Sequence, residues 1–252
     1  MNRSTCATLV AVAVALTACG GGGGSGSPVN SGGTAAPGSV GSSPGSTEGS
    51  TIVYNARAAW TNMLSTSRSW TVSGTGSDGQ AYELTLGIAP AGAAVFPVTG
   101  AAAAKADLSN LIRRQGAVVQ DLLNEQFFDA EYRMLGTRIS GDGEASYCSQ
   151  TSVVAALPFQ TAGEGAAGPL YAANTLSDCT GSGSVLGTSY HTWSLVKDAG
   201  VAYFCVSSSN KFLGEPTDRF TETCVETDAS GTLGSRARIR LVQPDFNIVA
   251  KS

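Results

Sequence analysis

The sequence predicts an all-β fold: an antiparallel sandwich or partly closed barrel built from hairpins, with one or two short helices near its N-terminus. Two observations predict this class. Polar and apolar residues alternate along several short runs, as in strands with one buried face, and residues that favour tight turns separate these runs. The pattern occupies residues 51–252, which are long enough for a single domain, with two candidate similar halves at about 51–145 and 146–252.

The first predicted elements lie between residues 56 and 86. Apolar residues within 56–66 recur at intervals near 3.6, which predicts a short helix that enters the domain. Residues 69–73 and 82–86 alternate in polarity and predict the two strands of a hairpin. Asp78-Gly79 lies between them and can adopt the positive φ angles of a tight turn.

Residues 105–123 allow two interpretations. Six apolar residues of this range fall on one helical stripe, which indicates an amphipathic helix. Gln115-Gly116 lies in the middle, however, where a hairpin turn could equally fall. An interior glycine costs a helix only about 1 kcal/mol, so it leaves the choice between helix and hairpin open.

The C-terminal half predicts two more hairpins. Each consists of two alternating runs that are separated by turn residues, and the hairpins led by Trp70 and Trp193 are alike enough to suggest an internal duplication. The predicted strand pairs are 191–196 with 201–206, and 220–226 with 237–242.

Residues 1–18 have the features of a bacterial lipoprotein signal peptide. Arg3 is followed by an uncharged, mostly apolar run that is shorter than the roughly 20 residues of a membrane-spanning helix. The run ends in Leu16-Thr17-Ala18-Cys19, which resembles the lipobox of these proteins. The resemblance implies that Cys19 is acylated, with palmitate as an expected chain, and anchors the protein in the lipid bilayer. Gly20 follows, and by analogy with Gram-negative sorting it favours the outer membrane, facing either the periplasm or the surface.

The residues after the anchor predict a flexible connection. Residues 19–50 consist largely of Gly, Ser and Pro, and Glu48 carries their only charge. Such a composition buries too little apolar surface to offset the entropy of ordering, so we expect a disordered tether.

Four cysteines remain for the domain, because Cys6 leaves with the signal peptide and Cys19 is acylated. An even number of cysteines in an exported domain predicts two disulfides. Four cysteines allow three pairings, and we favour the two that close short loops between neighbouring predicted strands. Zinc is a poor alternative, because CxxC spacing and nearby histidines are missing. The favoured pairs are Cys148 with Cys179 and Cys205 with Cys224.

The charges argue against nucleic acid as a partner. The formal net charge is −4, and the sequence contains no extended basic stripe. Arg236, Arg238 and Arg240 alternate along a predicted strand, which is typical of a solvated face.

Part of the C-terminal half resembles a group of uncharacterised lipoproteins of Gram-negative bacteria. These proteins share a Gly/Ser tether and Trp-led β-hairpins, and no activity follows from the resemblance. It favours strands over a helix for residues 105–123, and it matches Cys205 and Cys224 but not Cys148 and Cys179. The resemblance spans roughly 90 residues and is carried by short hairpin-like segments. These segments are Leu157-Pro158, 168–171, 192–195, 202–206, 221–224 and 228–231.

Two classes of function fit these features. The first is a membrane-anchored envelope lipoprotein whose non-catalytic β domain binds an envelope protein, a cell-wall component or a glycan. Its candidate contact residues are the aromatic side chains Trp60, Trp70, Trp193 and Tyr190, although aromatic residues more often belong to a core.

The alternative is a tethered extracytoplasmic hydrolase. His191 is the only histidine, so a catalytic triad requires it, with Asp178 or Asp198 as its orienting acid. No residue is assigned as catalytic, and we expect no metal ion or cofactor, because motifs for a nucleophile elbow, a phosphate loop, a dinucleotide or haem are missing. A carboxylate pair for glycoside hydrolysis could come from Glu83, Asp129, Glu131, Asp142 and Glu144.

Overall fold

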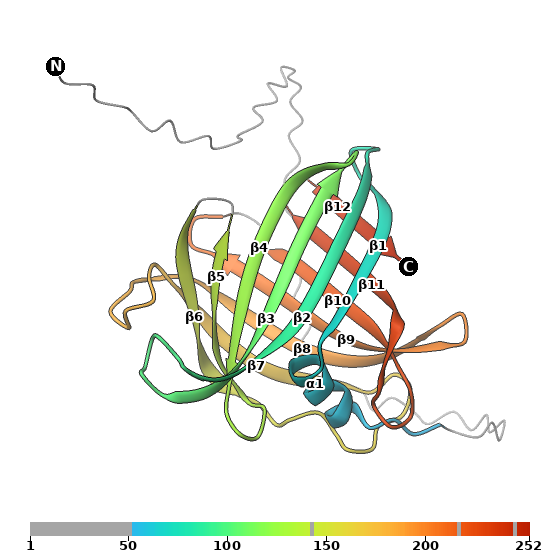
Figure 1. Ribbon diagram of the computed structural model, residues 1–252, viewed down its shortest axis with the longest axis horizontal. Coiled ribbons are helices and arrows are strands. Elements are labelled where there is room, and N and C mark those ends of the chain that lie inside the picture. The colour runs from blue at the N-terminus through green and yellow to red at the C-terminus, as the bar shows by residue number, and fades with distance from the viewer. Residues whose placement is uncertain (1–51, 142–143, 216–217, 244–245) are drawn as a thin grey trace, which may run out of the picture. The chain divides into compact units, whose positions relative to one another are not determined.

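The prediction of an all-β, antiparallel fold is confirmed, and the barrel is fully closed. A computed structural model describes residues 52–141, 144–215, 218–243 and 246–252, and within them twelve strands form one barrel (Figure 1). Each strand pairs with its sequence neighbours, and β1 pairs with β12 to close the ring. Residues 1–51, which include Cys19 and the predicted tether, lie outside the described residues.

One helix, α1 (Ala56–Ser65), precedes the strands in the described part of the chain. The strands are β1 (Arg68–Gly76), β2 (Ala81–Val95), β3 (Ala102–Arg114), β4 (Ala117–Phe128), β5 (Met134–Gly141), β6 (Glu144–Val154), β7 (Ala167–Leu176), β8 (Val185–Asp198), β9 (Val201–Phe212), β10 (Arg219–Thr227), β11 (Leu233–Gln243) and β12 (Phe246–Lys251).

The three hairpins predicted from alternation are present as β1–β2, β8–β9 and β10–β11. Residues 105–123 form most of a fourth, β3–β4, so the helical interpretation of this range is wrong. The turn between β3 and β4 explains why these residues form a hairpin and not a helix. Gln115 and Gly116 have φ angles of 51° and 83°, and two central residues with positive φ give the turn whose twist matches that of the flanking strands.

The helix α1 lies where the sequence predicts it and packs one face into the barrel. Asn55 caps its N-terminus, because the side-chain Oδ1 accepts a hydrogen bond from the backbone N–H of Ala58 at 2.9 Å. The polar residues of the helix lie away from the core. Its buried residues are Ala56, Ala59, Trp60, Met63 and Leu64.

Hydrogen bonds from α1 to three loops hold the helix at one end of the barrel (Figure 1). Trp60 Nε1 donates to the carbonyl oxygen of Tyr132 at 2.9 Å in the β4–β5 loop. Asn62 Nδ2 donates to Gly231 at 2.9 Å in the β10–β11 loop, and Arg57 Nε donates to Pro158 at 3.1 Å in the β6–β7 loop. We call this the helix end and the opposite end the far end.

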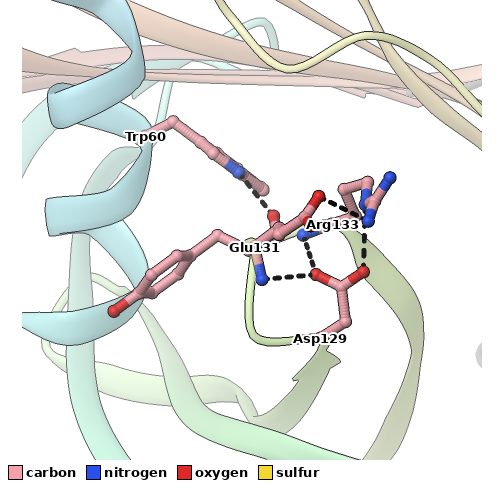
Figure 2. A network of polar contacts seen from close by, with 5 residues as sticks. Trp60, Asp129, Glu131 and Arg133 are labelled. Carbon is pink, nitrogen blue, oxygen red and sulfur yellow. Dashed lines mark hydrogen bonds and ion pairs between the residues drawn. The ribbon is translucent and has the colours of Figure 1, made fainter.

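The β4–β5 loop that receives Trp60 is braced by Asp129 (Figure 2). One carboxylate oxygen, Oδ1, accepts hydrogen bonds from the backbone N–H groups of Glu131 at 2.8 Å and Arg133 at 2.9 Å. The other oxygen pairs with Arg133 Nε at 3.0 Å, and Arg133 also pairs with the side chain of Glu131. These contacts fix the carbonyl oxygen of Tyr132 in place to accept from Trp60.

Inward-facing side chains near the helix end form the main hydrophobic core around α1. They alternate with outward-facing residues along each strand, as expected for a barrel. Large members of this core are Trp70, Leu84, Leu86, Phe128, Trp193, Leu195, Phe204 and Val225.

Both predicted disulfides are present. Cys148–Cys179 joins β6 to the β7–β8 loop, and Cys205–Cys224 joins facing positions of β9 and β10. Cys148, Cys205 and Cys224 are fully buried, although their strand positions face away from the barrel interior. The helix α1 has ten residues, and none of the helices in the described part of the chain is long and apolar enough to cross a bilayer.

Candidate ligand-binding site

The barrel contains a cavity of about 370 Å³ between α1 and the far end. Side chains of α1, namely Trp60, Met63 and Leu64, form its floor. Its wall is built from residues of strands β2 to β11, and most of these are polar. A volume of this size lies at the lower end of the roughly 300–1,000 Å³ of small-molecule sites.

Carboxamide side chains line one side of the cavity. Gln120, Asn124 and Gln126 occupy alternate inward-facing positions of β4, and Asn110 on β3 adds a fourth amide. None of these four side chains makes a hydrogen bond to another residue that the structure describes, and the Oδ1 atom of Asn124 is buried. Since buried polar groups are normally paired, this amide wall has unused capacity to bind a ligand.

Hydroxyl groups line the other side, on β5 to β10. Some of them pair with one another: Thr137 Oγ1 and Ser149 Oγ are 2.8 Å apart, and Asn210 Nδ2 donates to Ser208 Oγ at 3.3 Å. Thr221 and Thr223 also line this wall and make no side-chain hydrogen bond within the described residues. The hydroxyl wall therefore combines paired groups with free ones.

An aromatic pair stands between the polar wall and the core. The ring of His191 on β8 stacks on Tyr171 of β7, and Nε2 of His191 lies 3.1 Å from Ser189 Oγ. Burial lowers the pKa of His191 to about 4 and raises the pKa of the Tyr171 phenol. Both side chains are therefore uncharged at neutral pH.

The wall has little net charge. Arg219 is the one cationic side chain among the described lining residues, and it is paired with Glu215 at 2.6 Å and lies 5.1 Å above the Phe212 ring. No aspartate or glutamate lines the cavity within the described residues. His191 therefore has no acid partner in this part of the structure.

The acids considered for catalysis lie elsewhere. Glu83 pairs with Arg113 at 3.2 Å on the outside of the barrel, and Asp129 and Glu131 belong to the braced loop near α1. Asp178 accepts hydrogen bonds from Thr180, and Asp198 lies 3.8 Å from Arg238. Asp142 lies outside the described residues, and Glu144 begins β6.

The structure does not bring the four candidate contact aromatics together. Trp60 is 4% exposed and lies in the cavity floor. Trp70 and Trp193 are buried in the core, where Trp70 Nε1 donates to the carbonyl oxygen of Gly234 at 3.0 Å. Tyr190 is 61% exposed on the outer face of β8, since its neighbours Ser189 and His191 face the cavity.

Sequence reasoning missed the amide wall. Its signal is the spacing Gln120, Asn124, Gln126, which places three amides on one face of a strand. Leu122 shares that face and Leu123 lies on the other, so hydrophobicity alone does not reveal which face points inward.

Within the described residues, no three His, Cys, Asp or Glu side chains cluster closely enough to hold a metal ion. Comparison of the chain with protein-family models, curated proteins and solved structures finds no match.

Proposed function

We propose that the protein is a membrane-anchored envelope lipoprotein whose non-catalytic β domain binds a small ligand in the barrel cavity. One observation carries the proposal: the cavity is floored by α1, and its amide wall has donors and acceptors without partners among the described residues. A site of this kind recognises a ligand through hydrogen bonds that the protein itself leaves unmade.

The barrel is suited to hold such a site rigidly. Every described strand, β1 to β12, has two hydrogen-bonded neighbours, so this part of the structure has no free sheet edge. Bonds to three loops fix the floor, and the two disulfides restrain β6, β9 and β10. A preorganised wall lowers the entropy lost on binding.

The sequence and the disulfides together support export and anchoring. Leu16-Thr17-Ala18-Cys19 supplies the acylation pattern, and Gly20 favours the outer membrane. All four cysteines of the domain are paired, which is typical of oxidising compartments outside the cytoplasm. We therefore place the barrel at the cell envelope, tethered through residues 19–50.

The hydrolase alternative has weaker support. A triad needs an acid to orient His191, and the described wall offers only Ser189 and the Tyr171 ring as neighbours of this imidazole. With its pKa lowered to about 4 by burial, His191 is also a weak general base at neutral pH.

Anchoring is tested by replacing Cys19 with serine in the full-length protein. We expect Cys19→Ser to move the protein from the membrane fraction to the soluble fraction, whereas Cys6→Ser, which alters the signal peptide elsewhere, leaves it in the membrane. A Cys19→Ser variant that remains in the membrane and is released only by detergent would contradict the lipid anchor.

Ligand binding is tested with a cavity-filling variant. Thr223→Phe places a ring in the cavity, and Thr192→Phe places the same ring on the exposed outer face of β8. The probes are neutral oligosaccharides, uronic acids, short peptides and fatty acids. We expect one class to raise the thermal unfolding midpoint of the wild type and of Thr192→Phe, but not of Thr223→Phe. The proposal fails if every class leaves the wild type unchanged.

A further inference from the structure

We infer that the ligand of the cavity is an uncharged, polyhydroxylated molecule: a neutral sugar or a short neutral glycan. The inference rests on the proposed function, because it names the class of ligand that the same cavity takes. The charge, the hydrogen-bonding groups and the aromatic surfaces of the cavity all favour this class of ligand.

The charge of the wall disfavours ionic ligands. An anionic ligand needs a free cation, and Arg219 is already engaged by Glu215 through two hydrogen bonds of 3.0 and 2.6 Å. A cationic ligand needs a carboxylate, and the described lining residues supply none. His191 does not change this balance, since burial keeps it neutral at pH 7. A charged ligand would therefore lose its hydration without gaining a partner.

The hydrogen-bonding groups of the cavity wall are suited to bind the hydroxyl groups of a sugar. Each carboxamide offers both a donor and an acceptor, and each sugar hydroxyl can donate and accept as well. Asn124 and Gln126 lie two residues apart on β4, so their side chains enter the cavity about 7 Å apart along the strand. This spacing allows them to reach hydroxyls on two sides of one sugar ring, while Thr221 and Thr223 approach from the other wall.

The aromatic side chains of the cavity are suited to pack against the C–H faces of a sugar ring. A pyranose ring has C–H faces, which pack on aromatic rings while its hydroxyls point to the side. Trp60 in the floor and the stacked Tyr171–His191 pair, on β7 and β8 across the cavity from the amides, offer such surfaces. A fatty acid would use these surfaces, but it would leave the amides of Asn124 and Gln126 buried without partners.

The test measures the affinity of the full-length Cys19→Ser protein for neutral disaccharides by isothermal titration calorimetry, with glucuronic acid and oleate as competing classes. Asn124→Leu and Gln126→Leu remove a donor and an acceptor at nearly constant volume. Asn174→Leu makes the same change on the outer-facing side of β7 and serves as the control. Circular dichroism and thermal unfolding confirm that each variant is folded.

We expect at least one neutral disaccharide to bind, with its dissociation constant raised tenfold or more by Asn124→Leu or Gln126→Leu and unchanged by Asn174→Leu. Binding of glucuronic acid or oleate alone, blocked by Thr223→Phe, would overturn this inference and leave the proposed cavity function standing. Equal sugar affinity in all three leucine variants would also overturn it. Absence of any ligand among all the classes would contradict both proposals.

Discussion

The rings of Tyr171 and His191 stack nearly parallel, with 4.0 Å between their centroids and 13° between their planes. The two residues face each other on paired strands, β7 and β8, so the stack is fixed by strand register. It lies where the hydrophobic core meets the polar cavity. In this position the imidazole has Ser189 as its hydrogen-bond partner and no charged neighbour among the cavity residues that the structure describes.

This environment predicts an acid-sensitive contribution of His191 to stability. Its pKa is about 4 in the folded protein because burial disfavours the charged form, against about 6.5 in an unfolded chain. Between these values the unfolded state binds a proton that the folded state does not, so the free energy of unfolding falls as the pH drops from 6.5 to 4. The full loss is up to about 3 kcal/mol.

The measurement is urea unfolding at pH 7 and pH 4 for the wild type and His191→Gln. We expect the wild type to lose up to about 3 kcal/mol more than the variant, since the carboxylates contribute equally to both. Equal losses would show that His191 is protonated without cost in the folded barrel.

The attachment of the β10–β11 loop to α1 predicts a specific glycine effect. A Cβ atom added at Gly231 would lie 2.6 Å from the carbonyl oxygen of Asn55 and 2.7 Å from Ala58 Cβ, and Gly231 has a φ of 87°. Gly200 in the β8–β9 turn has a similar φ of 83°, with no atom within 4 Å of the same added Cβ.

We therefore expect Gly200→Ala to lower the free energy of unfolding by about 1 kcal/mol, because alanine disfavours the positive φ. Gly231→Ala should lower the free energy of unfolding by about 1–3 kcal/mol more than Gly200→Ala, because the β10–β11 loop and α1 must move apart. Thermal and urea unfolding of the two variants measure the difference. The close packing of the loop on α1 is contradicted if both variants lose the same stability.

Elements that depend on neighbouring residues were predictable from the sequence. Trp70 pairs with Leu86 across a short turn, and the alternation of the two runs and the Asp78-Gly79 turn are both visible in the chain. The helix α1 was predictable for the same reason, since its apolar spacing is local. The hairpin at Gln115-Gly116 was only half predictable, because the same residues satisfy a helical stripe and a strand pair.

Closure of the barrel and the cavity depend on distant residues. Gly74 on β1 pairs with Ala250 on β12, and no local pattern links two positions so far apart in the chain. The inward direction of Asn124 follows only from the register of β4 between β3 and β5. A polar interior also removes the hydrophobic contrast between the two faces of a strand, on which sequence reasoning relies.

An ion cluster around the buried Glu125, on the outer side of the barrel, predicts unequal roles for two glutamates. Glu125 on β4 has a side chain only 5% exposed and pairs with Lys105 at 2.7 Å and with Arg138. Burial by itself would raise the pKa of Glu125, but hydrogen bonds from Arg138 and Lys105 hold it below the usual value. Glu83 has a side chain 47% exposed, and among the residues that the structure describes it pairs only with Arg113.

We expect Glu125→Gln to lower the free energy of unfolding by about 3 kcal/mol, because Arg138 loses its carboxylate partner and Lys105 keeps only Asp107, at 3.0 Å. We expect Glu83→Gln to change the free energy of unfolding by less than about 1 kcal/mol. Acid should weaken the wild type more than Glu125→Gln, since the stabilisation by a carboxylate with a lowered pKa is lost as the pH falls through that pKa. Chemical unfolding at pH 7 and pH 3 provides both comparisons. Similar losses in the two variants at pH 7 would contradict a special role for Glu125.

The two disulfides predict additive losses of stability with a defined order. Their sequence separations are 31 residues for Cys148–Cys179 and 19 for Cys205–Cys224. Each disulfide lowers the entropy of the unfolded chain and thereby stabilises the folded state by about 3–4 kcal/mol. The longer loop contributes about 0.4 kcal/mol more than the shorter one.

Double alanine variants of each pair, and the variant lacking all four cysteines, are compared by urea unfolding with and without a reducing agent. We expect the free energy of unfolding of each double variant to be about 3–4 kcal/mol lower than that of the wild type, with the larger decrease for Cys148→Ala/Cys179→Ala. The reducing agent should destabilise the wild type and leave the four-alanine variant unchanged, which separates loss of the bond from loss of packing at the buried positions Cys148, Cys205 and Cys224. A wild type that is equally stable with and without reducing agent would mean that the bonds do not form or do not contribute, and the rigidity proposed for the cavity wall would then rest on the closed barrel and α1 alone.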